Sequence, residues 1–433
     1  MKNTTAISTT PSLANRLQTT PPPSLPLSFL AASLLGLVAF GVGLHYNAQW
    51  LVYSDTSYRA IGTVHLMMLA FLSTALLGAL HQFIPVITTK RLRSNKLGWI
   101  SLILFPTGAW LLAMGFFLNI TAIVAIAGII LLGSIITVIV NLSSPLHGGN
   151  KGVSATGLKL SLGFLVIVAL FGATYALDEK GVWFSLPGHL VMAHALFGLM
   201  GFLGISYMAV AEKLWPMFLL SHRNTDIRAK QAIYLTAIGV LLTSSAIAVQ
   251  LPLLALIGGV ILFLGIVAHL TSLFSYLHHK HRRLELLHAF ILISALFLVI
   301  VVVLAVLQLF VAAGSMERSR LIAASIAAVA SWLVLAVIGH MHKIIPFILF
   351  SLLRIKGIRM NKEGKPLSFS DLYNKNAARI TLVAAVLATT LLTGGLLLTS
   401  PRLLGIAGIL YVGVGTITFF NFTIGFCRVR LSR

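Results

Sequence analysis

Histidines inside apolar stretches are the residues of this chain best suited to chemistry. The 433 residues include 14 histidines but one cysteine, Cys427, which excludes a disulfide framework, a cysteine-ligated iron–sulfur cluster and a zinc ribbon. His65 and His194 both stand among apolar residues, where neutral imidazole is a common heme or metal ligand. They would suit one heme iron ligated from both sides, or two separate sites. The alternative is that each ring simply bonds to a neighbouring backbone or hydroxyl group.

His189 is a third candidate for cofactor binding. It precedes His194 by five residues, which turns the two side chains about 140° apart around a helix, so both cannot easily bind one ion.

A second group of candidate metal ligands contains His81, Glu212, His340 and His342. Imidazole and carboxylate suit zinc or iron, so His81, Glu212 and His342 could bind a divalent metal if their helices brought them together. His340 lies about 200° from His342 around a helix, so only one of these two can point inward. The alternative is that groups near the lipid headgroups reach water.

The composition identifies the solvent in which these residues must work. Hydrophobic residues make up 58% of the chain and charged residues 9%, with a mean hydropathy of +0.98, which excludes a soluble or disordered protein. Each apolar run is near or above the ~20 residues that cross a bilayer as a helix. The sequence therefore predicts an all-α polytopic membrane protein with about twelve spans. The runs cover 27–46, 60–87, 97–118, 120–141, 158–177, 187–220, 229–250, 252–277, 285–311, 319–350, 379–400 and 403–426.

The basic residues indicate orientation. The net charge is +22, and with a cytoplasmic N-terminus 24 of the 31 Lys and Arg residues fall in inner segments against five outside. The positive-inside rule then places both termini in the cytoplasm, and we expect the bacterial cytoplasmic (inner) membrane. The lipid bilayer and its anionic headgroups are the expected partners of these charges, and nucleic acid is not.

The chain divides into a tail and one membrane domain. Residues 1–26 are rich in Ser, Thr and Pro and predict a disordered cytoplasmic tail, whereas residues 27–433 form a single twelve-helix domain. All nine carboxylates are expected in loops or at span ends. Because proton pumps carry acids inside the membrane, proton pumping is not expected.

Three similar proline-terminated runs predict an internal repeat. Pro85, Pro216 and Pro346 end the second, sixth and tenth runs at nearly equal intervals, and each period holds four runs. This pattern predicts three four-helix arcs, at about 27–150, 151–284 and 285–433, whose second helices converge. His81, Glu212 and His342 occupy the same repeat position. Coincidence is the alternative, since proline often follows a helix end.

Twelve helices in three arcs resemble the catalytic subunit of the heme-copper oxidase superfamily, which includes the nitric oxide reductases. In that family the second span carries a heme-ligating histidine near its outer end, then a glycine-containing run that ends at a proline. The stretch from His65 through Gly78 to Pro85 is similar. The family's sixth span carries a copper-ligating histidine in its outer part, where His189 and His194 stand. The resemblance implies heme, with copper or another transition metal as a further cofactor, and an electron-donor protein or small subunit as partner.

The ligand set of that family is incomplete in this chain. The seventh run, 234–250, holds no histidine for copper. The His340-Met341-His342 sequence lies near the cytoplasmic end of its run, much further in than the family's His-x-His. We therefore expect a diverged heme-binding protein in electron transfer or in oxygen or nitric oxide chemistry. The alternative function is a membrane transporter or chaperone for a metal ion or heme.

Overall fold

The structure, a computed structural model, describes residues 21–53, 57–148, 152–178, 189–222, 226–361 and 364–430. These residues contain twelve helices long and apolar enough to cross a membrane. The only strand-like pairing among them is one isolated bridge between Met360 and Pro366. The predicted all-α polytopic membrane fold is confirmed, and it is the fold that hydrocarbon favours, because a helix satisfies its backbone hydrogen bonds internally.

The twelve spans are numbered here in chain order. Spans 2 and 6 each consist of an α-helix, a π-helix and a second α-helix. Span 1 is α2 (Ser24–Tyr53), span 2 is α3 (Tyr58–His65), η1 (Leu66–Ser73) and α4 (Thr74–Thr88), span 3 is α5 (Asn95–Leu118) and span 4 is α6 (Thr121–Gly148). Span 5 is α7 (Val153–Leu177), span 6 is α8 (His189–Leu196), η2 (Phe197–Gly204) and α9 (Ile205–Leu219), span 7 is α10 (Asp226–Ala248) and span 8 is α11 (Pro252–His278). Span 9 is α12 (Leu286–Leu307) with η3 (Gln308–Phe310), span 10 is α13 (Met316–Ile355), span 11 is α14 (Lys375–Leu397), preceded by η4 (Phe369–Leu372), and span 12 is α15 (Pro401–Arg430).

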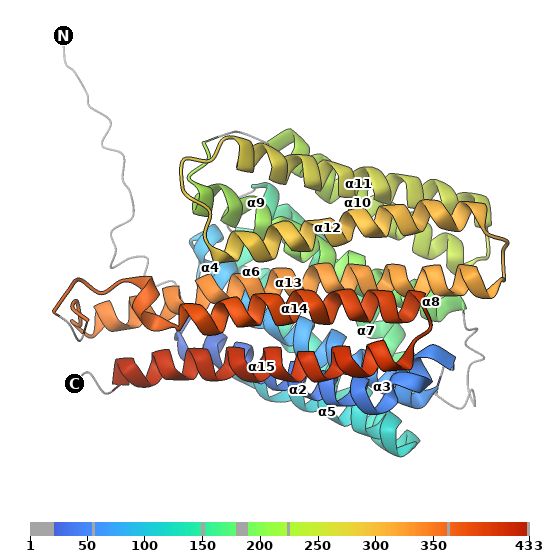
Figure 1. The fold of residues 1–433 in the computed structure, drawn as a ribbon, viewed down its shortest axis with the longest axis horizontal. Helices are drawn as coiled ribbons and strands as arrows, with labels where there is room; N and C mark the ends of the chain where they lie inside the picture. The colour runs from blue at the N-terminus through green and yellow to red at the C-terminus, as the bar shows by residue number, and fades with distance from the viewer. Residues whose placement is uncertain are drawn as a thin grey trace, which may run out of the picture.

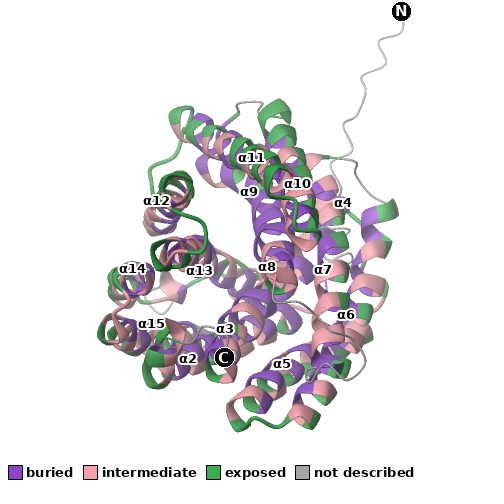
Figure 2. Cartoon of the chain, turned by 90° about the vertical axis from the view of Figure 1, so that its right-hand side faces the viewer, coloured by how far each residue is buried: buried purple, intermediate pink, exposed green. Residues whose placement is uncertain are grey.

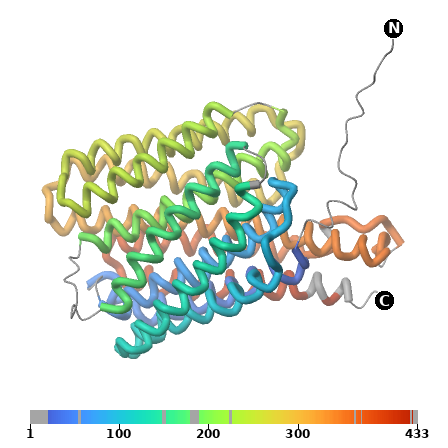
Figure 3. The backbone as a smooth tube through the Cα atoms, turned by 180° about the vertical axis from the view of Figure 1, so that it is seen from behind, coloured from blue at the N-terminus to red at the C-terminus, as the bar shows by residue number. Residues whose placement is uncertain are grey.

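The helices run side by side in a ring that closes on itself. Figure 1 shows their axes roughly parallel, and α2 packs along α15, so that the first and last spans are neighbours. Seen along the axes in Figure 2, α3, α8 and α13 lie toward the middle. The beginning of α2 and the end of α15 lie at one end of the bundle (Figure 3). We call this end, which also holds segments 89–94, 279–285 and 356–374, the basic end, and the opposite one the far end.

The repeat extends to the backbone of the first two units. Thr89 and Leu220 follow spans 2 and 6 at the same interval as the prolines of these two spans, each in a left-handed conformation with φ of 53° and 51°. The starts of the two π-helices are also separated by this interval. One interval therefore relates the prolines, the π-helices and the helix ends.

The third unit repeats a packing contact of the first. The ring of His81 stacks on Phe29 with centroids 5.2 Å apart, and the ring of His342 stacks on Phe290 at 5.4 Å, with interplanar angles of 21° in both. The interval between the two histidines along the chain equals the interval between the two phenylalanines. In both units, the span that carries the histidine (span 2 or span 10) thus packs against the first span of its own unit through the same pair of rings.

A glycine one turn before each of these histidines permits the contact. A Cβ atom at Gly78 would lie 2.3 Å from the Cβ of Phe29, and one at Gly339 would lie 2.6 Å from the Cβ of Phe290. Both neighbouring atoms are fixed close to the backbone, so neither can rotate away.

We therefore expect Gly78→Ala and Gly339→Ala each to lower the free energy of unfolding by about 1–3 kcal/mol through overpacking. Gly413→Ala is the matched control, because nothing lies within 4 Å of a Cβ atom there. Thermal unfolding in detergent, followed by tryptophan fluorescence, measures the effect. Equal unfolding midpoints for all three variants would contradict the packing described.

Candidate functional site

The three inner spans meet at the π-helices. η1 contacts η2, and both contact α13, so spans 2, 6 and 10 converge as the repeat predicts. Within η1 and just after it, the hydroxyls of Ser73 and Thr74 donate to the carbonyls of Met68 and Leu69, five residues earlier. π-Helical turns are rare and occur frequently at functional sites. The backbone therefore departs from regular α-helix at the same place in two units, where the units touch.

His65 ends α3, directly before η1. Its Nδ1 lies 2.8 Å from the carbonyl oxygen of Ile61, to which it donates, and its ring centroid lies 5.7 Å from that of Phe116 on α5. Because this hydrogen bond occupies Nδ1, Nε2 is the atom available to a ligand. A ring nitrogen anchored to a backbone carbonyl is the usual arrangement of a metal-binding histidine.

His194 lies on α8 and faces α7. Its Nδ1 is buried without a hydrogen-bond partner. Its ring sits 6.4 Å from that of Tyr175, and its Cε1 lies 3.3 Å from the place that a Cβ atom on Gly172 would occupy. His65 directly precedes η1 and His194 lies three residues before η2, and the two π-helices contact each other. The structure thus places both histidines next to the contact between the first and second units.

The two histidines do not occupy equivalent positions in the repeat. The shift that relates the first two units would place the equivalent of His65 at Leu196, two positions beyond His194, and two residues turn a helix by about 200°. The two rings therefore leave their helices on opposite sides in the frame of the repeat, His65 beside Phe116 on α5 and His194 beside Tyr175 on α7.

His189 is not available as a ligand. Its Nε2 donates to the carbonyl of Ala248 at 3.1 Å, and its Nδ1 accepts from the side-chain amide of Gln250 at 3.0 Å. Gln250 follows the end of α10 in a left-handed conformation, with φ of 58°. The histidine therefore ties the start of span 6 to the end of span 7, with both ring nitrogens occupied.

His81, Glu212 and His342 do not meet, contrary to the expectation of a shared metal site. Each faces an outer helix of its own unit: the two histidines stack on phenylalanines of spans 1 and 9, and Glu212 bonds to α11. The repeat that makes these residues equivalent also turns them away from one another. Across the described ranges, no group of three His, Cys, Asp or Glu side chains could hold a metal ion.

His340 and His342 point to different units, as their spacing predicts. The ring of His340 lies 5.8 Å from Tyr207 and 6.5 Å from Phe218, both on span 6, whereas His342 lies among Phe290 and Phe422. His340 donates its Nδ1 proton to the carbonyl of Ala336, and its Nε2 is buried without a partner.

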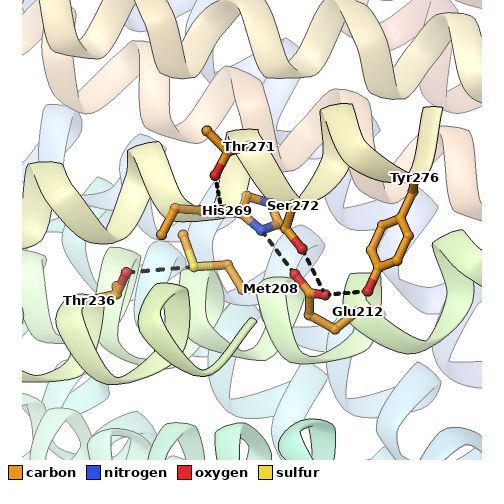
Figure 4. Close-up of polar contacts among 8 residues, drawn as sticks. Met208, Glu212, Thr236, His269, Thr271, Ser272 and Tyr276 are labelled. Atoms are coloured by element: carbon orange, nitrogen blue, oxygen red, sulfur yellow. Dashed lines mark hydrogen bonds and ion pairs between the residues drawn. The ribbon is translucent and has the colours of Figure 1, made fainter. Parts of the chain in front are cut away.

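A polar network that was not among the sequence-based expectations surrounds Glu212. Its Oε2 accepts hydrogen bonds from Ser272 at 3.1 Å and Tyr276 at 2.9 Å, and its Oε1 lies 3.9 Å from Nδ1 of His269 (Figure 4). Glu212 is buried and lies seven residues before the end of α9, so the expectation that every carboxylate lies in a loop or at a span end is wrong. His269 is fully buried, with both ring nitrogens lacking a hydrogen-bond partner.

The network has a signal in the sequence. His269, Ser272 and Tyr276 stand at positions i, i+3 and i+7 of an apolar helix, which places them on one face. Glu212 and His269 therefore place a carboxylate beside an imidazole inside the helical bundle.

Two sites therefore lie within the membrane. No known protein family and no curated protein matches the chain in sequence. The first site offers two imidazoles, His65 and His194, and the second offers a carboxylate and an imidazole, Glu212 and His269.

We expect Glu212→Leu to lower the free energy of unfolding by about 3 kcal/mol, because it removes the buried carboxylate that accepts from the hydroxyls of Ser272 and Tyr276 and lies beside His269. Lys213→Leu, at the exposed neighbouring residue, should have little effect. In a double-mutant cycle measured by thermal unfolding, His269→Leu should cost clearly less when Glu212 is already replaced. Additive losses would show that the two side chains do not interact.

Proposed function

We propose that the chain is an integral membrane heme protein that transfers electrons, in which His65 and His194 would hold the heme iron. The observation that supports the proposal is the position of two partly buried imidazoles on α3 and α8, next to the contact between η1 and η2, with no group of three His, Cys, Asp or Glu side chains in the described residues that could hold a metal ion instead. A zinc ion ordinarily takes three or four protein ligands. Heme iron already has four porphyrin nitrogens and needs only two more.

The surroundings of the pair fit such a group. His65 presents Nε2 while Ile61 holds its other nitrogen, and His194 keeps a buried nitrogen without a partner. Phe116 and Tyr175 flank the two rings with aromatic surface, and Gly172 leaves room beside His194. A heme bound there supplies reversible one-electron exchange at iron. Two histidine ligands favour electron transfer over oxygen or nitric oxide chemistry, since they leave no iron position for a gas.

The orientation and partners belong to the same proposal. Lys and Arg concentrate in the segments of the basic end, which supports a cytoplasmic location for that end in a bacterial inner membrane. The far end, nearer to His65 and His194, would then face an electron-donor protein or a small partner subunit. The resemblance to the heme-copper oxidase catalytic subunit supports this arrangement.

A transporter or chaperone for a metal ion or heme is the second candidate function. One observation favours it: the buried pair of Glu212 and His269, because acids inside the membrane frequently serve as proton relays in transporters. In this case His65 and His194 would bind the transported group transiently.

Purified protein is expected to show a heme absorption band and one heme per chain. His65→Ala and His194→Ala should each abolish or strongly reduce bound heme, while His81→Ala, on the same span as His65 but outside the site, should retain it. His65→Met should keep heme and raise its reduction potential, because thioether ligation stabilises the reduced iron.

Optical spectra and redox titration measure these outcomes. Wild-type spectra in both alanine variants would overturn the ligand assignment. Protein that folds, holds no heme and carries a metal into proteoliposomes would favour the transporter instead.

A further inference from the structure

The third unit departs from the repeat at one place, at the basic end. In the first two units, the last span begins at the same interval after the proline of span 2 or span 6. In the third unit, the last span begins at Pro401, and the interval from Pro346 to Pro401 is longer by about half. The additional residues extend α13 to Ile355 and form most of segment 356–374, which carries η4. Figure 1 shows this extension projecting beyond the neighbouring helices. The basic end of the third unit therefore holds chain that the other two units lack.

The extension covers a cavity of about 410 Å³ between α12, α13 and α14. Phe369 and Tyr373, from the additional segment, line one side of it. Four cationic side chains line the cavity, from the segment before α12 and from α13 and α14, and Glu285 is its only acidic lining residue among the described residues. The cations are Arg282 before α12, Lys343 on α13, and Lys375 and Arg379 on α14.

The single carboxylate is already engaged. Glu285 bonds to Lys343 at 2.5 Å and lies 3.4 Å from Arg282. Burial acts to raise the pKa of Glu285, but Lys343 and Arg282 outweigh it and hold that pKa below its ordinary value, so the carboxylate is ionised at neutral pH. With one negative and four positive charges, the lining carries a net charge of +3.

Two of the four cations lack an acidic partner. Arg379 lies 3.5 Å from the side-chain oxygen of Asn376, and within the described part of the chain neither Arg379 nor Lys375 forms an ion pair with a carboxylate. Asp371 does not serve them, since its Oδ2 accepts from the backbone and hydroxyl of Ser368. Like charges around one cavity repel, and an anion between them would remove that repulsion.

Two helix starts add to the positive potential. α12 begins at Leu286 and α14 at Lys375, and both residues line the cavity. The N-terminus of a helix carries a partial positive charge that favours anions. Arginine side chains in addition present paired N–H groups that match the oxygens of a phosphate.

We propose that this cavity binds a phosphate group, held by Lys375 and Arg379 against Arg282 and Lys343 and covered by Phe369 and Tyr373. A phospholipid headgroup and a soluble phosphate compound share this chemistry, and the basic end of the bundle is accessible to both. The occupant would join α12, α13 and α14 to the additional segment, and so lock the extension onto the third unit. This proposal is independent of any heme.

The test uses the full chain, purified in detergent and stripped of lipid, with two probes: inorganic phosphate, and phosphatidylglycerol against phosphatidylcholine. Thermal unfolding reports phosphate binding, and native mass spectrometry reports retained lipid. The double variant Lys375→Gln/Arg379→Gln removes the two unpaired cations. Lys356→Gln/Arg359→Gln is the matched control, since it removes the same charge from exposed positions in the extension that do not line the cavity.

We expect the wild type and the control to bind phosphate or phosphatidylglycerol, and the cavity variant to bind at least about tenfold more weakly, as the loss of charge-assisted hydrogen bonds predicts. Stabilisation by inorganic phosphate identifies a soluble anion as sufficient. Selective retention of phosphatidylglycerol without a phosphate effect identifies a lipid headgroup. Equal weakening in both double variants, or no binding of either probe by the wild type, would overturn the proposal.

Discussion

A polar side chain inside the bilayer must find its partner within the protein, because hydrocarbon offers none. The four histidines at positions 65, 81, 340 and 342 meet this constraint in one way: Nδ1 bonds to the carbonyl four residues earlier, at 2.7–2.8 Å. That bond uses one nitrogen and directs the rest of the ring outward from the helix. What each histidine can do then depends on its neighbours, which are phenylalanine for His65, His81 and His342, and Tyr207 for His340.

The repeat decides which of these side chains can meet. Residues at equivalent positions are related by the pseudo-symmetry that brings the inner spans together, so each turns into its own unit, as His81 and His342 do. Each of the three candidate sites lies where one unit departs from the repeat. At the first, His65 and His194 are offset by two positions from equivalence. At the second, Glu212 stands where the other units have histidine, and at the third, the third unit has an additional segment.

Hydropathy and the proline interval were sufficient to predict twelve spans and the convergence of three of them, because both depend on the period along the chain. Side-chain direction was not predictable in the same way. His189 is occupied by Gln250, 61 residues away, and His269 matters only because α11 packs beside α9. Glu212 was expected in a loop or at a span end, but in the structure it is buried seven residues before the end of α9. Contacts between distant helices determine these outcomes, and a single sequence does not encode them locally.

The three units are joined in three different ways. α2 and α15 pack closely, and α6 packs against α7, but α11 and α12 barely touch. At this third boundary the inner helices contact each other instead. The ring of Tyr207 on α9 lies 5.1 Å from Trp332 and 5.8 Å from His340, both on α13. The same ring lies 5.9 Å from His269 on α11. Because the outer helices contribute little there, the buried aromatic and polar side chains around Tyr207 must hold the second and third units together. Glu212, which fixes α11 to α9, is therefore part of the attachment between units as well as a protonatable group.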